Sequence, residues 1–110
     1  MAFETKGTKI MMDAYDYGLQ LPFEISEIDF ESNDKILFEL KKDKNSGVII
    51  SKEYSNQSTS EDIVRVFLEF TKKESEGLHP GNYVYYLKHI REGQVRDTLV
   101  LGEDFQIRNG

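Results

Sequence analysis

The chain has 110 residues, 20 acidic against 14 basic side chains, a formal charge of −6 and no cysteine. Such a length suits a single modest core, so we expect residues 1–110 to form one domain. Without cysteine, a disulfide framework, a thiolate metal site and a cysteine nucleophile are excluded. The negative charge argues against a general nucleic-acid binder, which needs clustered Lys and Arg.

The N-terminal residues contain no recognisable targeting signal. Residues Met1–Lys6 lack the apolar region of a signal peptide. No apolar run approaches the roughly 20 residues that span a bilayer. We therefore expect a protein made in the cytoplasm, with no membrane insertion.

Strands are predicted from the start of the chain. Thr8–Met12 predicts a short first strand. A period-two alternation follows and predicts a half-buried strand; its apolar members are Leu19, Leu21, Phe23 and Ile25. Pro22 falls on the outward phase and has no N–H to donate, so this strand should lie at an edge or carry a bulge.

A β-hairpin is predicted over Ile36–Tyr54. The apolar residues Ile36, Phe38 and Leu40 alternate with Leu37, Glu39 and Lys41. Asp43–Gly47 then forms a strong turn signal, because Asn and Gly tolerate positive φ. The chain resumes with β-branched residues from Val48.

Residues 63–70 are ambiguous between strand and helix. Val64, Val66, Leu68 and Phe70 would share a strand face, whereas Ile63, Val66, Phe67 and Phe70 would share a helix face. Capping boxes at Ser58 with Glu61, or Thr59 with Asp62, would suit the helix. The β-branched and aromatic content favours the strand. Thr71–Leu78 then predicts one or two helical turns ending near Gly77.

The C-terminal third predicts further strands. The turn His79–Asn82 leads into Tyr83–Ile90, which is apolar on both phases and should be central or covered on both sides. Arg91–Gln94 turns the chain into Val95–Leu101, and Phe105–Ile107 predicts a short final strand. The whole pattern, about seven strands with one short helical turn, predicts an all-β, immunoglobulin-like antiparallel β-sandwich that lacks the Cys and Trp hallmarks.

Candidate chemistry is weak throughout. Five acidic residues raise a calcium hypothesis but lack EF-hand spacing, so solvated turns and strand edges explain them better: Asp13, Asp16, Asp29, Glu31 and Asp34. The spacing of His79 and His89 matches no metal-ligand motif. No phosphate-binding loop and no Gly-x-Ser-x-Gly elbow occurs. We therefore predict no catalytic residue, no metal and no cofactor.

Candidate contact residues are aromatic or apolar. Tyr83 and Tyr85 are best explained as core, while Tyr15 and Tyr17 suit a core or a contact surface equally. Leu37 and Phe67 lie on the outward strand phase, where they would meet the short helix or a neighbouring subunit. The candidate interface residues are Tyr15, Tyr17, Leu37 and Phe67.

A family resemblance rests on segments in a fixed order. They are Tyr17–Ile25, Asp34–Lys42 and Leu78–Leu87, followed by Asp97–Val100 and Phe105–Ile107. Over about residues 10–107 the chain resembles the N-terminal β-sandwich domain of phage baseplate upper proteins and related prophage tail proteins of Gram-positive bacteria. The resemblance implies a strand at residues 63–70 and a helical turn at residues 72–77.

The resemblance also implies a role. Such a domain is a non-enzymatic docking module that binds other tail or baseplate proteins in a homo- or hetero-oligomer. It would be made in the bacterial cytoplasm and located in the virion tail after assembly. Family members often continue into a coiled coil or a further domain, whereas this chain ends at Gly110, as a stand-alone accessory protein or a truncated product. The alternative is an immunoglobulin-like module that binds a glycan or a protein through exposed tyrosines.

Overall fold

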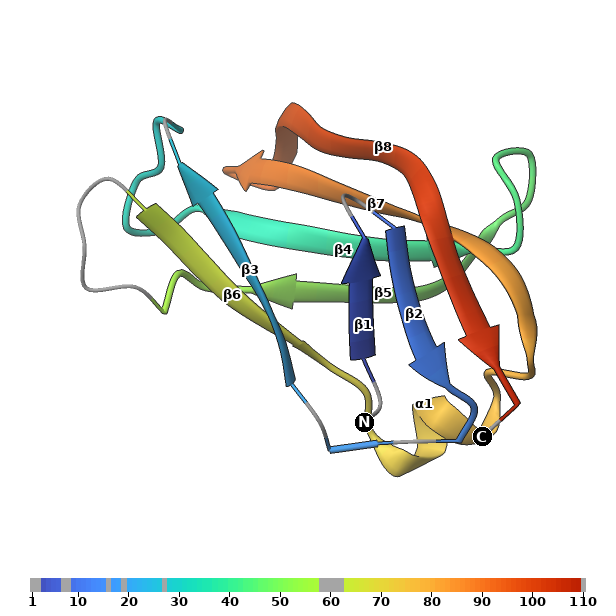
Figure 1. Ribbon diagram of the computed structural model, residues 1–110. Coiled ribbons are helices and arrows are strands. Elements are labelled where there is room, and N and C mark those ends of the chain that lie inside the picture. The colour runs from blue at the N-terminus through green and yellow to red at the C-terminus, as the bar shows by residue number, and fades with distance from the viewer. Residues whose placement is uncertain are drawn as a thin grey trace.

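The computed structural model describes residues 3–6, 9–15, 17–18, 20–26, 28–57 and 63–109. These residues form strands in two layers and one short helix (Figure 1). The elements in chain order are β1 (Phe3–Lys6), β2 (Lys9–Asp13), β3 (Gln20–Ser26), β4 (Lys35–Lys41), β5 (Val48–Tyr54), β6 (Ile63–Glu69), α1 (Lys72–Glu76), β7 (Gly81–Arg91) and β8 (Gln94–Arg108). The predicted all-β sandwich with one helical turn is confirmed.

The larger sheet has six strands in the order β1-β2-β8-β7-β4-β5, and the smaller sheet pairs β3 with β6. Five of these pairings are antiparallel, but β2 runs parallel to β8. The prediction of a wholly antiparallel sandwich is therefore wrong at this pair. Within the described residues β3 has β6 as its only partner, so the predicted edge position of Pro22 is confirmed.

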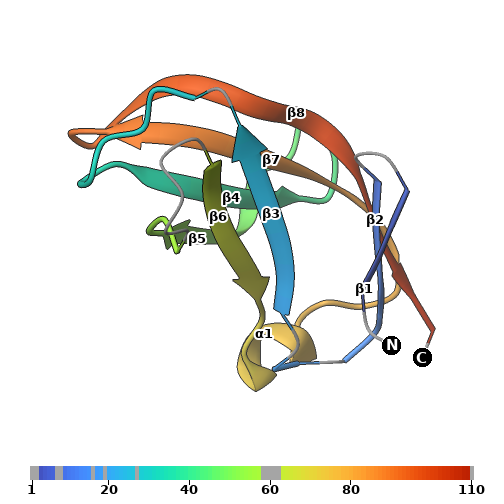
Figure 2. The ribbon, with the colours of Figure 1, turned by 60° about the vertical axis from the view of Figure 1, so that its left-hand side comes forward.

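The C-terminal segment differs from its prediction. In place of two short strands, β8 runs continuously and bends sharply, so its first half pairs with β7 alone and its second half also pairs with β2 (Figure 2). Gly102 lies at the bend with φ +64°. A Cβ atom there would come within 3.2 Å of the Tyr86 hydroxyl oxygen. Because glycine has no Cβ atom, it adopts this left-handed backbone without strain and avoids the close contact with Tyr86.

Residues 63–70 follow the strand alternative. Val64, Val66 and Leu68 are buried, and the residues between them are half-buried, which is the alternation of a strand with one face on the core. β7 lies between β4 and β8, which explains why its sequence is apolar on both phases. The largest fully buried side chains are Tyr85, Phe38, Phe70, Phe105, Ile10, Met12, Ile36, Leu40, Leu68, Leu78, Leu87 and Ile107.

Aromatic rings occupy the centre of the sandwich. Phe38 of β4 stacks on Tyr85 of β7 with ring centroids 6.1 Å apart, and Phe23 of β3 lies 6.2 Å from Tyr85 across the two sheets. In antibody domains a disulfide between the sheets and a Trp on the third strand hold this position. In this protein, which has no cysteine, the rings of Phe23, Phe38 and Tyr85 pack at the centre of the sandwich.

The segment that joins the sheets is fixed by two local hydrogen-bond devices. The hydroxyl of Thr71 accepts from the Glu74 N–H while the Glu74 carboxylate accepts from the Thr71 N–H, which is a capping box. The Tyr83 hydroxyl donates to the His79 carbonyl oxygen at 2.8 Å. This second contact has the geometry of the tyrosine corner of immunoglobulin-like domains.

Replacing Tyr83 by phenylalanine should test the corner. The ring would stay in place, but the His79 carbonyl would lose its hydrogen bond, at about 1 kcal/mol of unfolding free energy. We expect a thermal midpoint about 4 °C lower in a calorimetric scan. Tyr17→Phe is the matched control, because Tyr17 is exposed. Equal midpoints for Tyr83→Phe and the unaltered protein would argue against a structural role for this hydroxyl.

Candidate docking site at the loop end of the sandwich

One end of the sandwich, here named the loop end, brings the β3–β4 connection against the β7–β8 turn (Figure 1). Glu92 and Gly93 have φ values of +54° and +76°. Two consecutive positive φ values are typical of the two-residue type I′ hairpin turn, in which Gly is preferred at the second position. The turn places Arg91 directly before the corner, facing the connection.

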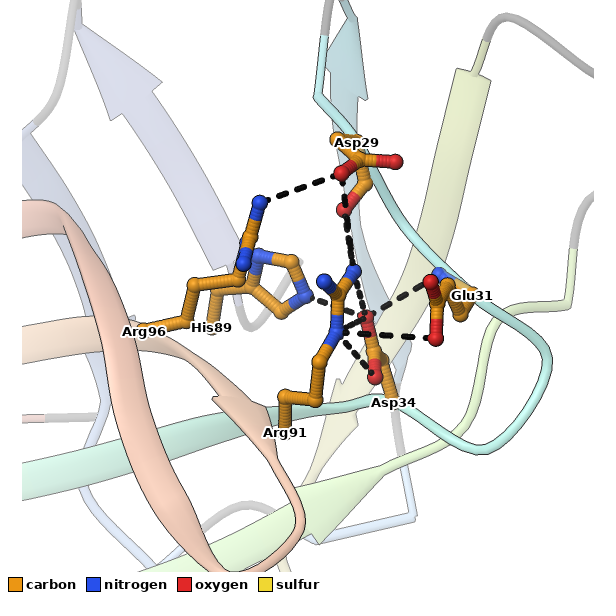
Figure 3. Close-up of polar contacts among 6 residues, drawn as sticks. All are labelled: Asp29, Glu31, Asp34, His89, Arg91 and Arg96. Atoms are coloured by element: carbon orange, nitrogen blue, oxygen red, sulfur yellow. Dashed lines mark hydrogen bonds and ion pairs between the residues drawn. The ribbon is translucent and has the colours of Figure 1, made fainter.

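Asp34 is the centre of a buried polar network at the loop end (Figure 3). Its carboxylate accepts from the ring Nε2 of His89 at 2.6 Å, and Arg91 Nη2 donates to the same oxygen at 2.9 Å. The Glu31 N–H also donates to this carboxylate, and the Asp34 N–H donates back to the Glu31 carbonyl oxygen. Asp34 therefore joins the β3–β4 connection to the end of β7.

The charge state of this network follows from its contacts. Asp34 and His89 side chains are each 2% exposed. Hydrogen bonds from the Arg91 guanidinium hold the pKa of the Asp34 carboxyl far below its usual range, although burial opposes the shift. The same carboxylate raises the pKa of Arg91. Because an ionised carboxylate only accepts hydrogen bonds, the proton of the short contact belongs to His89 Nε2.

An outer ring of contacts surrounds the buried pair. Arg91 Nη2 donates to the Asp29 carbonyl oxygen at 2.9 Å, and Arg96 binds the Asp29 carboxylate at 3.1 Å. The ring of Phe30 stacks on His89 with centroids 5.1 Å apart. The Asp29 side chain is 72% exposed, so its ion pair contributes little, whereas the inner contacts of Asp34 are shielded from water.

A cleft of about 410 Å³ lies beside the network. We name it the Leu37 cleft. Its lining combines apolar residues of the outer sheet face with charged residues of the strands and turns: Leu37, Ile90, Val95, Glu31, Asn33, Asp34, Lys35, Glu53, Arg91, Glu92 and Gly93. Leu37 is half-buried and Val95 is 54% exposed, so apolar surface is open to a partner.

A second cleft of about 430 Å³ lies on the other side of the network. It is lined by Ile25, Ile28, Asp29, His89, Arg96, Asp97 and Leu99. Asp34 and Arg91 line the first cleft, whereas His89 and Asp29 line the second. Residues of the buried network therefore contribute to the lining of both clefts.

The structure does not bring the four predicted interface residues to one surface. Tyr15 and Tyr17 are 52% and 53% exposed, and the Tyr15 hydroxyl lies 3.3 Å from Nδ1 of His79, just before β7. Leu37 lies on the outer face of the six-stranded sheet, in the cleft at the opposite end of β7. Phe67 lies on the outer face of the smaller sheet, opposite Pro22.

The acidic residues weighed as calcium ligands have other partners. Asp29, Glu31 and Asp34 do converge, but around the Arg91 guanidinium. Asp13 pairs with Arg108 at 3.0 Å. Asp16 lies outside the described residues, and so do the capping boxes considered for residues 58–62. In the described part of the chain no cluster of three acidic, His or Cys side chains has a metal-binding arrangement.

The sequence pattern marks His89 only as one of two histidines without a metal-ligand motif, and the pattern does not reveal its network. One signal was present: His89 shares the strand phase of Tyr83, Tyr85 and Leu87, which are all buried. A polar side chain on a buried phase needs a partner. The identity of that partner, Asp34, depends on the pairing of β4 with β7 and is not visible locally.

Comparisons with known proteins return nothing: no family model matches the chain, and neither the curated proteins nor the solved structures include a match. In the described ranges, no helix has the length and apolar character needed to cross a membrane.

Proposed function

We propose that the protein is a non-enzymatic docking module of a phage or prophage tail or baseplate. The observation that carries this proposal is the Leu37 cleft, where open apolar surface is held on a frame fixed by the buried Asp34 network. A contact surface that is ordered before binding loses little conformational entropy when a partner docks. Such pre-ordering favours docking by a subunit that works by surface complementarity.

The tail assignment comes from the family resemblance. Two of its implications concern local structure, a strand at residues 63–70 and a helical turn at residues 72–77, and the chain has β6 and α1 at these places. The Pro80–Tyr83 segment of the resemblance forms the tyrosine corner. The residue pattern alone also favours this strand and predicts this helical turn, so the tail assignment depends on the order and spacing of the resembling segments.

The positions of the contact residues suggest the kind of assembly. Leu37 and Phe67 lie on outer faces of different sheets, so one partner surface does not cover both. Subunits in a ring use two different patches, each meeting the other patch of a neighbour. A ring, or a module held between two different tail proteins, fits this placement.

Substituting Phe67 by serine should impair assembly more than folding. Phe67 is half-buried on the outer face, so the loss of unfolding free energy should be about 1 kcal/mol. Co-expression with the proteins encoded by the neighbouring genes, followed by light scattering of the purified complex, measures assembly. Leu37→Ser should act in the same way.

Val48→Ser is the matched control, because Val48 is an exposed apolar residue outside the Leu37 cleft and the outer face of the smaller sheet. It should leave the complex intact. If Phe67→Ser and Leu37→Ser lose thermal stability and assembly in equal measure, their roles are structural and these surfaces do not dock.

The alternative of a glycan- or protein-binding module depended on an exposed tyrosine patch. Tyr83, Tyr85 and Tyr86 are buried, whereas Tyr15 and Tyr17 are exposed, so two tyrosines of the proposed patch lie on the surface. The two clefts of the loop end would instead be the ligand site of such a module. A monomer that binds a ligand and ignores all tail proteins would support this second function.

A further inference from the structure

We propose that the Leu37 cleft receives an arginine side chain of the docking partner. This inference rests on the proposed docking function and adds the chemistry of the partner. It follows from three features of the cleft: an apolar base, an excess of carboxylates, and cations that already have partners.

The apolar base is set by strand register. On the outer face of the six-stranded sheet, Ile90 pairs with Val95 across β7 and β8, and Leu37 lies in the neighbouring strand β4. The three side chains share the lining of the cleft. They offer a surface on which the methylene chain of a long side chain can pack.

The charged lining is acidic. Glu53 lies directly opposite Leu37 in the register of β4 and β5, Glu92 is in the β7–β8 turn, and Glu31 is in the β3–β4 connection. Within the described residues neither Glu53 nor Glu92 forms an ion pair. Two carboxylates on different elements therefore face the cleft without a cation.

Both cations of the lining already have hydrogen-bond partners. Arg91 binds Asp34, and Lys35 Nζ donates to the Ser55 hydroxyl at 2.7 Å. The cleft lining carries four carboxylates against two cations, so its net charge is negative, in a protein whose formal charge is −6. A partner with a long apolar stem and a cationic end complements the cleft best. Arginine fits better than lysine, because its planar guanidinium binds carboxylates from more than one direction and is more weakly hydrated.

The test uses a small probe, N-acetyl-arginine amide, titrated into the protein with labelled methyl groups. We expect saturable NMR shifts at the methyl groups of Leu37, Ile90 and Val95, with a dissociation constant in about the millimolar range. N-acetyl-citrulline amide has nearly the same shape without the charge, and it should bind at least about fivefold more weakly. Raising the salt concentration should weaken binding of the arginine probe and leave binding of the citrulline probe unchanged.

A matched pair of variants separates a local site from the general charge of the protein. Glu53→Gln with Glu92→Gln should weaken the arginine probe about fivefold, whereas Glu76→Gln with Glu103→Gln should not change it. Both pairs alter the net charge equally, and Glu76 and Glu103 are exposed residues outside the cleft lining.

The proposal is overturned by equal shifts from the citrulline probe, by the absence of saturation, or by equal effects of the two variant pairs. Each of these results would leave the docking function standing, because that function is tested separately by complex formation with tail proteins. Loss of complex formation in Leu37→Ser together with normal probe binding to the unaltered protein would support both.

Discussion

Replacement of Asp34 by asparagine should destabilise the protein by about 3 kcal/mol. The substitution keeps the shape of the side chain but removes the charge that compensates Arg91 and accepts from His89. Breaking a buried ion pair from one side leaves the other charge without compensation, and this costs more than the pair contributes when intact. For a domain of this size, the loss is a large fraction of a total that is usually 5–15 kcal/mol.

Urea unfolding followed by circular dichroism would measure this loss at pH 7. Asp29→Asn is the matched control, because Asp29 carries the same charge in the same network but is 72% exposed. Its effect should stay within about 0.5 kcal/mol. Similar losses of unfolding free energy in the two variants would contradict the larger contribution to stability that we assign to Asp34.

The same residue makes the stability depend on pH. The pKa of Asp34 in the folded protein is lowered, chiefly by hydrogen bonds from Arg91, so the folded state binds fewer protons than the unfolded state, whose pKa is about 3.9. The contribution of Asp34 is therefore complete above about pH 5 and decreases as the pH falls through 3.9. The difference between the unaltered protein and Asp34→Asn should narrow from pH 5 to pH 2.5. A constant difference would show that the charge is not the source of the stability.

Replacement of Phe38 by alanine should have a comparable or larger effect. Phe38 is 0% exposed, and its ring contacts the rings of Phe70, Tyr85 and Phe105 at centroid distances of 6.1–6.2 Å. Loss of a buried phenylalanine costs about 3–5 kcal/mol, from lost burial and from the cavity that remains. The protein has no disulfide to limit the entropy of the unfolded chain, so its stability depends on core packing of this kind.

Calorimetry should detect a thermal midpoint at least about 12 °C lower for Phe38→Ala. Phe38→Leu retains much of the side-chain volume, so its loss of stability should be less than about half of the loss in Phe38→Ala. Phe30→Ala is a useful comparison, since Phe30 is a partly buried aromatic residue at the edge of the core. If Phe30→Ala and Phe38→Ala lost the same stability, the central ring cluster would not be the main source of cohesion.

The strands were predictable because their signal is local. Alternation of Ile36, Phe38 and Leu40 reports one buried face, and a run that is apolar on both phases, as in β7, reports a central strand. The parallel pair of β2 with β8 was not predictable in this way. This pairing joins strands near the two ends of the chain. It has no local sequence signal, because the residue pattern of each strand is the same with a parallel or an antiparallel neighbour.

The bend of β8 was missed for a related reason. Gly102 and the acidic residues after it suggested a break between two strands, since Gly usually weakens a strand. In the folded protein the same glycine absorbs the bend, and the chain continues in one strand. Gly102 therefore does mark an irregularity in the strand. Whether the strand ends there or bends depends on its pairing with the neighbouring strands.

The outward orientation of each candidate interface residue was predictable from the sequence, but their arrangement in the fold was not. The outward phase of Leu37 and Phe67 follows from strand alternation, and both are half-buried on outer faces. Their separation, and the convergence of Asp34, His89 and Arg91, depend on strand order. Residues that are 55 or more positions apart meet here only because β4 pairs with β7.

The sequence of about ten kilobases of DNA on each side of the gene tests the central claim most directly. The proposed tail-docking function predicts neighbours that encode a tape-measure-length chain, tail fibres, a holin or a lytic amidase. Such neighbours would also supply the partners for the complex-formation experiments on Leu37 and Phe67. Neighbours from ordinary metabolism or from surface-protein operons would contradict the tail assignment, and the loop end would then be screened with glycan and protein ligands.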